Sequence, residues 1–353
     1  MSAQPTLPLF TKPETPLRIL QAGFFQLRRY GEIHASSSIK LHTGFIRNGH
    51  YVQAFSDRDV AAFEAPFGWR DLGKGKANRK FVEMCLAVRP DLLVLGHSAI
   101  ITNDTIRKVR KELPSLVVAL CNFDALFVPH NVVHIKERCE VVDHVFVSTA
   151  VDELERCLGK TRAQYHYLPN PVDSAIDRFD ASLRDDLPWD LLFCSYGKGF
   201  GDRTALVEEI RTKLPQLRFR TPGMDDAPPV WGIDYDTALS QAAMGLNLNR
   251  QEGMHWYSSD RISQLAGNGL LVFTHADPRF DELFPAETLV YYRTAGELVD
   301  RIAEFKADPA KRKAWAARTR AHVHGHFCCE RVSRYIASTA LGIPDASDYA
   351  WLR

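Results

Sequence analysis

The chain has 353 residues, of which 45% are hydrophobic and 25% are charged. This length exceeds one ordinary domain core and favours two domains of middling size. The formal net charge is +1, which excludes the strong positive field that is typical of nucleic-acid-binding proteins. The composition is that of a globular protein without low-complexity tracts.

The sequence predicts a cytoplasmic protein. Its start is polar and rich in proline, without the basic and apolar regions of a secretory signal. No apolar run approaches the roughly 20 residues that span a bilayer. The seven cysteines are odd in number and have no C-x-x-C spacing, which favours a reduced setting. Two basic runs, at residues 74–80 and 107–111, leave peripheral association with anionic lipid open, and homo-oligomer formation is open as well.

The first half of the chain alternates apolar, strand-like runs with amphipathic segments. We expect helices at residues 37–48 and 77–88 and a third helix that Asp104 caps. We expect strands at residues 17–22, 51–55, 91–96, 116–120, 142–148 and 165–168. Strand, helix and strand at this spacing form right-handed parallel crossovers, so the pattern predicts a doubly wound domain.

The second half repeats the same alternation. Expected strands lie at residues 190–195, 216–220, 245–249, 269–274 and 289–292. Expected helices begin near residue 202 and cover residues 295–306, 309–322 and 330–341. The boundary falls in the non-periodic stretch 173–188, which gives domains of 1–180 and 181–353, and the last helix is free to pack back on the first domain. Ligands of such sheets bind at the carboxyl ends of the strands, so we expect the site in a cleft between the domains.

The segment at residues 247–274 reads as strand, polar loop, helix, glycine and strand. It places Glu252 eight residues before Asp260, which Arg261 directly follows. A helix N-terminus offers backbone N–H groups and a positive dipole end to an anion. A carboxylate there can hold a sugar or ribose hydroxyl, and arginine adds a fixed charge for a diphosphate. The segment therefore predicts a nucleotide-sugar site.

A glycine-containing loop at residues 196–203 follows the first strand of the second domain. Glycines let the backbone approach a phosphate, and a helix follows. Lys198 and Arg203 are therefore candidates for binding the donor diphosphate. The alternative is an ordinary loop between a strand and a helix.

Four segments resemble the GT-B glycosyltransferases, of the retaining kind that includes the family-4 enzymes and the CgeB-like group. They are YLPNPVD at 167–173, DYDTALSQAAMGLNLNR at 234–250, RISQLAGNGLLVF at 261–273 and residues 287–298. The resemblance implies two facing Rossmann-like domains, a nucleotide-sugar donor and a glycan or lipid-linked glycan acceptor. It also implies hexosyl transfer with retention of configuration and a place in bacterial surface polysaccharide or lipopolysaccharide synthesis. We expect no metal ion or other cofactor, because arginine and lysine can neutralise the diphosphate.

The resemblance assigns roles in the second domain. Family-4 enzymes carry two glutamates eight residues apart, and Glu252 matches the first. Asp260 has the spacing of the second, whereas alignment on Gly269 puts Gln264 there, and the strand after Gly269 favours that alignment. The amide of Gln264 can bond ribose hydroxyls but cannot act as a base. The alternative is that Asp260 caps a helix and Gln264 is a surface residue.

In the first domain, the resemblance points to Gly23, His97 and Asp124, each after a predicted strand. A glycine at the place of Gly23 lies near the donor phosphates in these enzymes. His97 is expected to bond the donor sugar, and Asp124 to bond or deprotonate the acceptor hydroxyl. The alternative for His97 is a loop histidine that backbone groups satisfy. His34 is a further candidate for the acceptor side.

Two patterns raise metal binding, and neither predicts it. Histidines alternate at residues 322–326, but no cysteine or carboxylate spacing completes a zinc site. D-x-D triplets occur at residues 57–59 and 234–236. The first contains its own cation, Arg58, and Asp236 is expected to cap a helix. The aromatic stretch 255–257 either stacks on a base or sugar or packs in the protein.

Two other functions stay open on the same scaffold. A sugar-nucleotide 2-epimerase would need acid and base groups at the sugar and would use no acceptor. A catalytically silent GT-B subunit, with Gln264 in place of a carboxylate, would bind a glycan or a partner without turnover.

Overall fold

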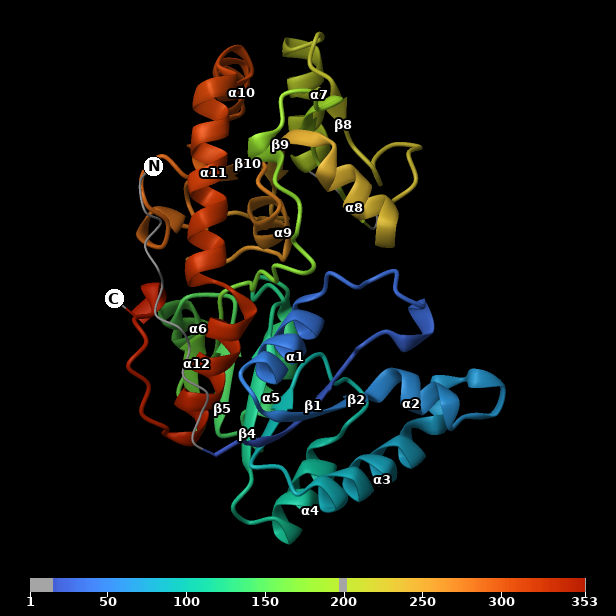
Figure 1. The fold of residues 1–353 in the computed structure, drawn as a ribbon. Coiled ribbons are helices and arrows are strands. Elements are labelled where there is room, and N and C mark those ends of the chain that lie inside the picture. The colour runs from blue at the N-terminus through green and yellow to red at the C-terminus, as the bar shows by residue number, and fades with distance from the viewer. Residues whose placement is uncertain (1–14, 197–201, 353) are drawn as a thin grey trace.

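The computed structural model describes residues 15–196 and 202–352, which form two α/β domains stacked one above the other (Figure 1). Lys198 and the proline-rich start of the chain lie outside the described residues. The first domain is built on a six-stranded parallel sheet with the order β2-β1-β3-β4-β5-β6. Its strands are β1 (Arg18–Gly23), β2 (Tyr51–Ser56), β3 (Leu92–Leu95), β4 (Val117–Asn122), β5 (His144–Val147) and β6 (Gln164–Tyr167).

Helices cover both faces of this sheet because its strands are apolar on both sides. Leu92 and Val94 face the core under α1, whereas Leu93 and Leu95 face the core under α3 and α4. The helices of this domain are α1 (Ser37–Arg47), α2 (Asp57–Phe63), α3 (Arg70–Val88), α4 (Asn103–Glu112), α5 (Pro129–Arg138) and α6 (Val151–Leu158).

The second domain has a five-stranded parallel sheet with the order β11-β10-β9-β7-β8. Its strands are β7 (Trp189–Leu192), β8 (Phe219–Arg220), β9 (Ala242–Asn247), β10 (Leu271–His275) and β11 (Val290–Tyr292). Its helices are α7 (Asp202–Lys213), α8 (Gly232–Ser240), α9 (Arg261–Gly267), α10 (Ala295–Ala307) and α11 (Pro309–His326). The prediction of two doubly wound parallel-sheet domains is thus confirmed.

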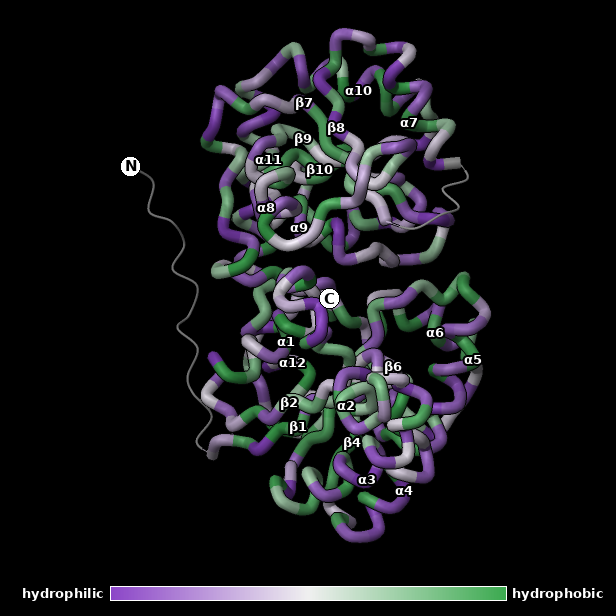
Figure 2. The backbone as a smooth tube through the Cα atoms, turned by 90° about the vertical axis from the view of Figure 1, so that its right-hand side faces the viewer, coloured by the Kyte–Doolittle hydropathy of each residue, from purple (hydrophilic) through white to green (hydrophobic). Residues whose placement is uncertain are grey.

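The last long helix, α12 (Cys329–Leu341), packs on the first domain beside α1 (Figure 1). The Asn48 amide after α1 donates to the Ser333 hydroxyl of α12 at 3.0 Å. The ring of Tyr335 meets Phe146 of β5 edge to face, with centroids 5.7 Å apart. In the hydropathy-coloured tube, apolar segments concentrate at the centre of each domain (Figure 2). No helix among the described residues has the length and apolar character to cross a bilayer.

Two expected helix caps were wrong. Helix α4 begins at Asn103, and the Thr102 hydroxyl accepts from the Thr105 N–H, so Asp104 lies inside the first turn. Asp236 lies inside α8 rather than before it, because that helix already begins at Gly232. The histidine-rich stretch also belongs to α11, which extends past the predicted end at residue 322.

Candidate functional site

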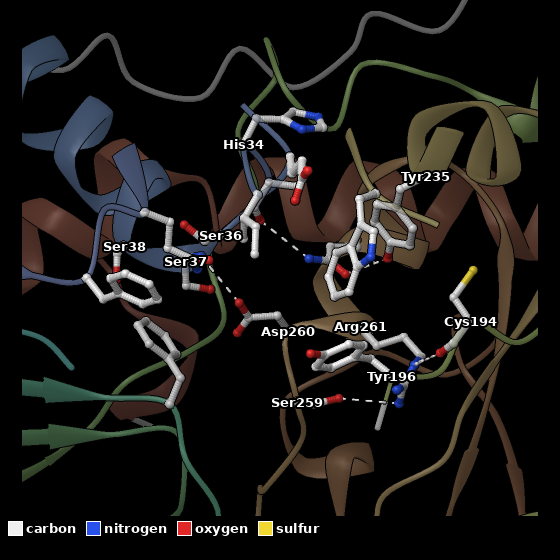
Figure 3. Close-up of a pocket in the computed structure, with 18 of the residues that line it drawn as sticks. His34, Ser36, Ser37, Ser38, Cys194, Tyr196, Tyr235, Ser259, Asp260 and Arg261 are labelled. Carbon is white, nitrogen blue, oxygen red and sulfur yellow. Dashed lines mark hydrogen bonds between the residues drawn. The ribbon is translucent and has the colours of Figure 1, made fainter. Parts of the chain in front are cut away.

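A cavity of about 570 Å³ lies between the two domains (Figure 3). The first domain contributes Phe24, residues 32–38, Arg58, His97, Phe123 and Asp124 to its wall. The second domain contributes residues 194–196, 229–231, Tyr235, 259–261 and Gln264. Six of the predicted site residues therefore share one cavity: His34, His97, Asp124, Asp260, Arg261 and Gln264.

His97 and Asp124 form a pair on the first-domain wall. They follow β3 and β4, which are neighbours in the sheet, and the His97 Nδ1 lies 3.3 Å from the Asp124 Oδ2. Burial lowers the pKa of His97, but the hydrogen bond and the charge of Asp124 outweigh burial and raise it above 6.5. Burial raises the pKa of Asp124, but the hydrogen bond and charge of His97 outweigh burial and hold that pKa below its usual value. The pair favours an imidazolium beside a carboxylate, not a loop histidine satisfied by backbone groups.

Arg261 supplies positive charge on the opposite wall. Its Nε donates to the Cys194 carbonyl at 3.3 Å and its Nη1 to the Leu248 carbonyl at 3.0 Å. The guanidinium also lies over the Phe193 ring, 5.0 Å from its centroid. Among the described residues Arg261 makes no ion pair with a carboxylate, and burial lowers its pKa. Neutral groups thus orient a half-buried charge that remains available to an anion.

Arg203 adds to this positive region without lining the cavity. It lies in the first turn of α7 and is 9% exposed. Burial and the nearby charges of Arg261 and Arg250 lower the pKa of Arg203 to about 10. Arginines that perturb one another in this way mark a place where the protein concentrates positive charge.

Asp260 and Gln264 both connect the two domains. The Ser37 N–H of α1 donates to Asp260 Oδ2 at 3.3 Å, and Asp260 makes no capping bond to its own helix. The Gln264 Oε1 accepts from the Tyr235 hydroxyl at 2.6 Å, and its Nε2 donates to the Ala35 carbonyl at 3.4 Å. Figure 3 shows the bond between Ser37 and Asp260. The alternative of a plain helix cap and a surface glutamine does not describe these side chains.

Glu252 and Gly23 lie outside the cavity wall. The Glu252 carboxylate accepts from the backbone N–H and the side-chain amide of Asn249, both at 3.1 Å, and burial raises its pKa. Gly23 is buried at the end of β1, and a Cβ there would lie 3.5 Å from the Gly96 Cα. Their predicted roles stay predictions.

An aromatic pair at the second-domain end of the cavity was not predicted from the sequence. Tyr196 follows β7 and Trp231 precedes α8, and their rings meet edge to face with centroids 4.7 Å apart. The double proline at residues 228–229, just before Trp231, was the available signal, because prolines hold a loop in one conformation. Near this pair, the ring of His34 bonds Asp236 of α8 at 2.9 Å, so an expected helix cap is instead a contact between domains.

The predicted aromatic stretch 255–257 lies elsewhere. His255 bonds Asp152 of α6 and Glu282, each at 2.9 Å, and the Trp256 indole donates to Glu282 at 3.0 Å. None of the three residues lines the cavity. Packing between the domains is therefore the role that their contacts describe.

Known proteins resemble this chain over almost its whole length. A sucrose-phosphate synthase from Thermosynechococcus elongatus superimposes with a TM-score of 0.62 at 14% identity, covering 92% of this chain and 98% of its own. The Anabaena protein Alr3699/HepE, solved with UDP and glucose, superimposes with a TM-score of 0.57 at 13% identity. The match covers 92% of this chain and 99% of the Anabaena chain. The chain has the GT-B fold. A provisionally named UDP-N-acetylglucosamine 2-epimerase from Listeria monocytogenes superimposes with a TM-score of 0.58 at 11% identity. The match covers 95% of this chain and 99% of the Listeria chain.

At the level of sequence, the match to a known family lies mostly in the second domain. Residues 203–338 match the family described as glycosyl transferase-like. No curated protein sequence matches the chain. The finer resemblance to the family-4 and CgeB-like groups stays a prediction.

The GT-B fold explains why the cavity residues come together. Phe24, His97 and Asp124 follow the ends of β1, β3 and β4, and Cys194 follows β7. Parallel strands bring their carboxyl ends to one edge of a sheet, and the two edges face each other here. Residues far apart in the sequence therefore converge on one space.

Proposed function

We propose that the protein is a glycosyltransferase that moves a sugar from a nucleotide-sugar donor to a hydroxyl of a glycan or lipid-linked glycan. One observation carries the proposal. A single interdomain cavity combines Arg261, a half-buried cation without an ion-pair partner among the described residues, with the His97–Asp124 pair opposite. The first suits a diphosphate, and the second suits sugar hydroxyls.

The donor would bind mainly to the second domain. Departure of the nucleoside diphosphate moves negative charge onto its phosphate oxygens, and a fixed guanidinium stabilises that charge without reorganisation. Arg261 would supply this stabilisation, with Arg203 behind it. The exposed ring of Tyr196 and its partner Trp231 offer faces for the base. In this proposal arginine charge acts where some other transferases use a metal ion.

The acceptor would bind beside His97 and Asp124. Its hydroxyl oxygen attacks the anomeric carbon while the bond from that carbon to the phosphate oxygen breaks. The hydroxyl proton passes to the departing phosphate, as the resemblance to retaining enzymes implies. The lowered pKa of Asp124 suits a hydrogen-bond acceptor that orients the hydroxyl better than a strong base. The His97 imidazolium would donate to a donor-sugar hydroxyl.

The test is a screen of UDP-, GDP-, ADP- and dTDP-sugars and CMP-sugars for released nucleotide, with wild type and Arg261→Gln. We expect slow hydrolysis of one donor by the wild type and at least a tenfold loss in the variant, because one charge-stabilising group is worth about 10²–10³ in rate. Lys213→Gln, an exposed change on α7, is the matched control. Equal turnover by all three proteins would remove Arg261 from the site.

The likeness to the Listeria protein keeps 2-epimerisation as a second candidate. The same incubations distinguish a transferase from an epimerase, because a 2-epimerase inverts the configuration at carbon 2 of the sugar and needs no acceptor. Recovery of an epimerised nucleotide sugar would replace the transferase proposal. Nucleotide binding without turnover of any sugar would instead support a silent binding subunit.

A further inference from the structure

A second cavity, also of about 570 Å³, opens in the first domain beside the reaction cavity. Phe24 and Arg58 line both cavities, so the two adjoin. The remaining wall comes from residues 28–29, Asp59 and residues 68–72. These segments follow β1 and connect α2 to α3, and in Figure 1 both project from the same side of the first domain.

Positive charge dominates this wall. Arg28, Arg58 and Arg70 line it, and none of them makes an ion pair among the described residues. The two acids of the wall are engaged elsewhere. Asp59 accepts from the Leu27 N–H at 2.8 Å, and Asp71 pairs with Lys74 at 2.6 Å. The fourth arginine, at position 29, is itself paired with an acid.

An aromatic ring holds one of these arginines, Arg58. Its guanidinium lies over the Phe24 ring, 4.6 Å from the centroid, at the junction of the two cavities. Stacking orients a guanidinium without consuming its charge, and the planar fork then matches the oxygens of a phosphate. Arg28 and Arg70 line the same cavity, and three guanidinium groups around one space suit an anionic ligand.

The rim of the same cavity is apolar and exposed. Phe67 is 94% exposed, Trp69 is 67% exposed and Leu72 is 60% exposed. The rings of Phe67 and Trp69 lie 6.4 Å apart. Phe67 also has a φ of 55°, in a region that bulky residues rarely adopt, and this conformation presents its ring outward. Clustered large apolar side chains on a surface mark a binding face.

We propose that this second cavity binds the phosphate headgroup of a membrane lipid, while Phe67, Trp69 and Leu72 insert among the acyl chains. Arginines around the headgroup and aromatic and aliphatic side chains beside them are the two components of a peripheral membrane site. Resting on the proposed function, the adjoining reaction cavity would then receive a lipid-phosphate-linked acceptor from the bilayer. The binding itself does not depend on catalysis.

The test is co-sedimentation with vesicles of phosphatidylcholine, alone or containing phosphatidic acid. Wild type should bind the anionic vesicles more strongly. The double variant Arg28→Gln/Arg70→Gln should lose binding by about fivefold per arginine at low salt. Arg318→Gln, an exposed change on α11 of the second domain, is the control and should bind as wild type does. Neither altered arginine lines the reaction cavity.

The apolar rim is tested separately with Phe67→Ser/Trp69→Ser. Salt screens the arginine contribution but not the apolar one, so this variant should lose binding at high salt as well as low. Circular dichroism confirms that each variant is folded. Equal sedimentation of wild type and both double variants would overturn the proposal. So would tight binding of inorganic phosphate without vesicle binding, because that would indicate a site for free phosphate.

Failure of this inference is distinguishable from failure of the proposed function. Vesicle binding through these residues without turnover of any nucleotide sugar supports the membrane site and overturns the transferase. Turnover with a soluble acceptor but no vesicle binding supports the transferase and overturns the membrane site.

Discussion

The buried ion pair between Lys40 and Asp177 offers the most direct test of how the domains are joined. Lys40 lies on α1 of the first domain, and Asp177 lies in the segment that leads to the second. The Lys40 Nζ and the Asp177 Oδ2 are 2.7 Å apart, and each side chain is 1% exposed. Lys40→Met keeps the length of the side chain and removes its charge, so it isolates a buried carboxylate.

The expected loss in the free energy of unfolding is large because neither charged group reaches solvent. Removing one partner of a buried pair costs about 3–5 kcal/mol, whereas an exposed pair is worth about 0–1 kcal/mol. The cost should also depend on pH. Burial already raises the pKa of Asp177 above 3.8 with Lys40 present, and without Lys40 it rises further. A carboxyl with a raised folded-state pKa destabilises the fold above that pKa, so the deficit should shrink as pH falls toward 3.8.

Urea unfolding followed by tryptophan fluorescence measures the loss. Lys40→Met/Asp177→Asn should recover most of the stability, because the neutral amide still accepts from the Asp173 N–H that Asp177 now satisfies at 2.8 Å. Lys74→Met, in an exposed pair with Asp71, is the control. A Lys40→Met variant within about 1 kcal/mol of wild type, or a deficit that does not change with pH, would refute the reasoning.

Three further outcomes are expected at the site. Trp231→Ala should weaken binding of the cognate nucleoside diphosphate by about 1–3 kcal/mol if the ring supports the base, and unchanged calorimetric affinity would exclude that contact. The His97 ring should titrate above 6.5 by NMR and shift lower in Asp124→Asn, since the partner charge raises its pKa; identical titrations would show that the pair does not form. Gln264→Glu should bind the nucleotide within a few fold of wild type, whereas Gln264→Leu should lose about tenfold, because only the glutamate keeps an acceptor for hydroxyl groups.

The strands were predictable because the chemistry of a doubly covered parallel sheet is local. All four residues of β3 are buried, and a short, wholly apolar run before a polar residue is typical of a strand that helices cover on both faces. The short helices were not predictable in the same way. Helix α2 has seven residues and begins directly after β2, and the sequence showed its first turn only as a D-x-D triplet with a cation between the acids. In the structure both carboxylates accept backbone N–H groups, from Ile100 and Leu27 respectively.

The partners across the cavity could not be predicted from the sequence. His34 bonds Asp236 over 202 residues, and the Ser37 N–H bonds Asp260 over 223. Every residue except proline carries a backbone N–H, so no sequence pattern identifies the one that bonds Asp260. The side-chain candidates were visible as polar residues after strands, but the contacts that orient them depend on how two separate sheets face each other.

The conflict between Asp260 and Gln264 has a physical cause. The two residues are four apart at the start of α9, and residues at this spacing lie on the same side of a helix. Both side chains therefore reach the cavity, and each holds a different part of the first domain, the N-terminus of α1 and the Ala35 carbonyl. A carboxylate at the first turn of α1 is favoured by the helix dipole, so the Asp260 contact stabilises the packing of the two domains against each other. In this chain, then, both side chains bond groups of the first domain and both line the same cavity, so alignment alone could not choose between them.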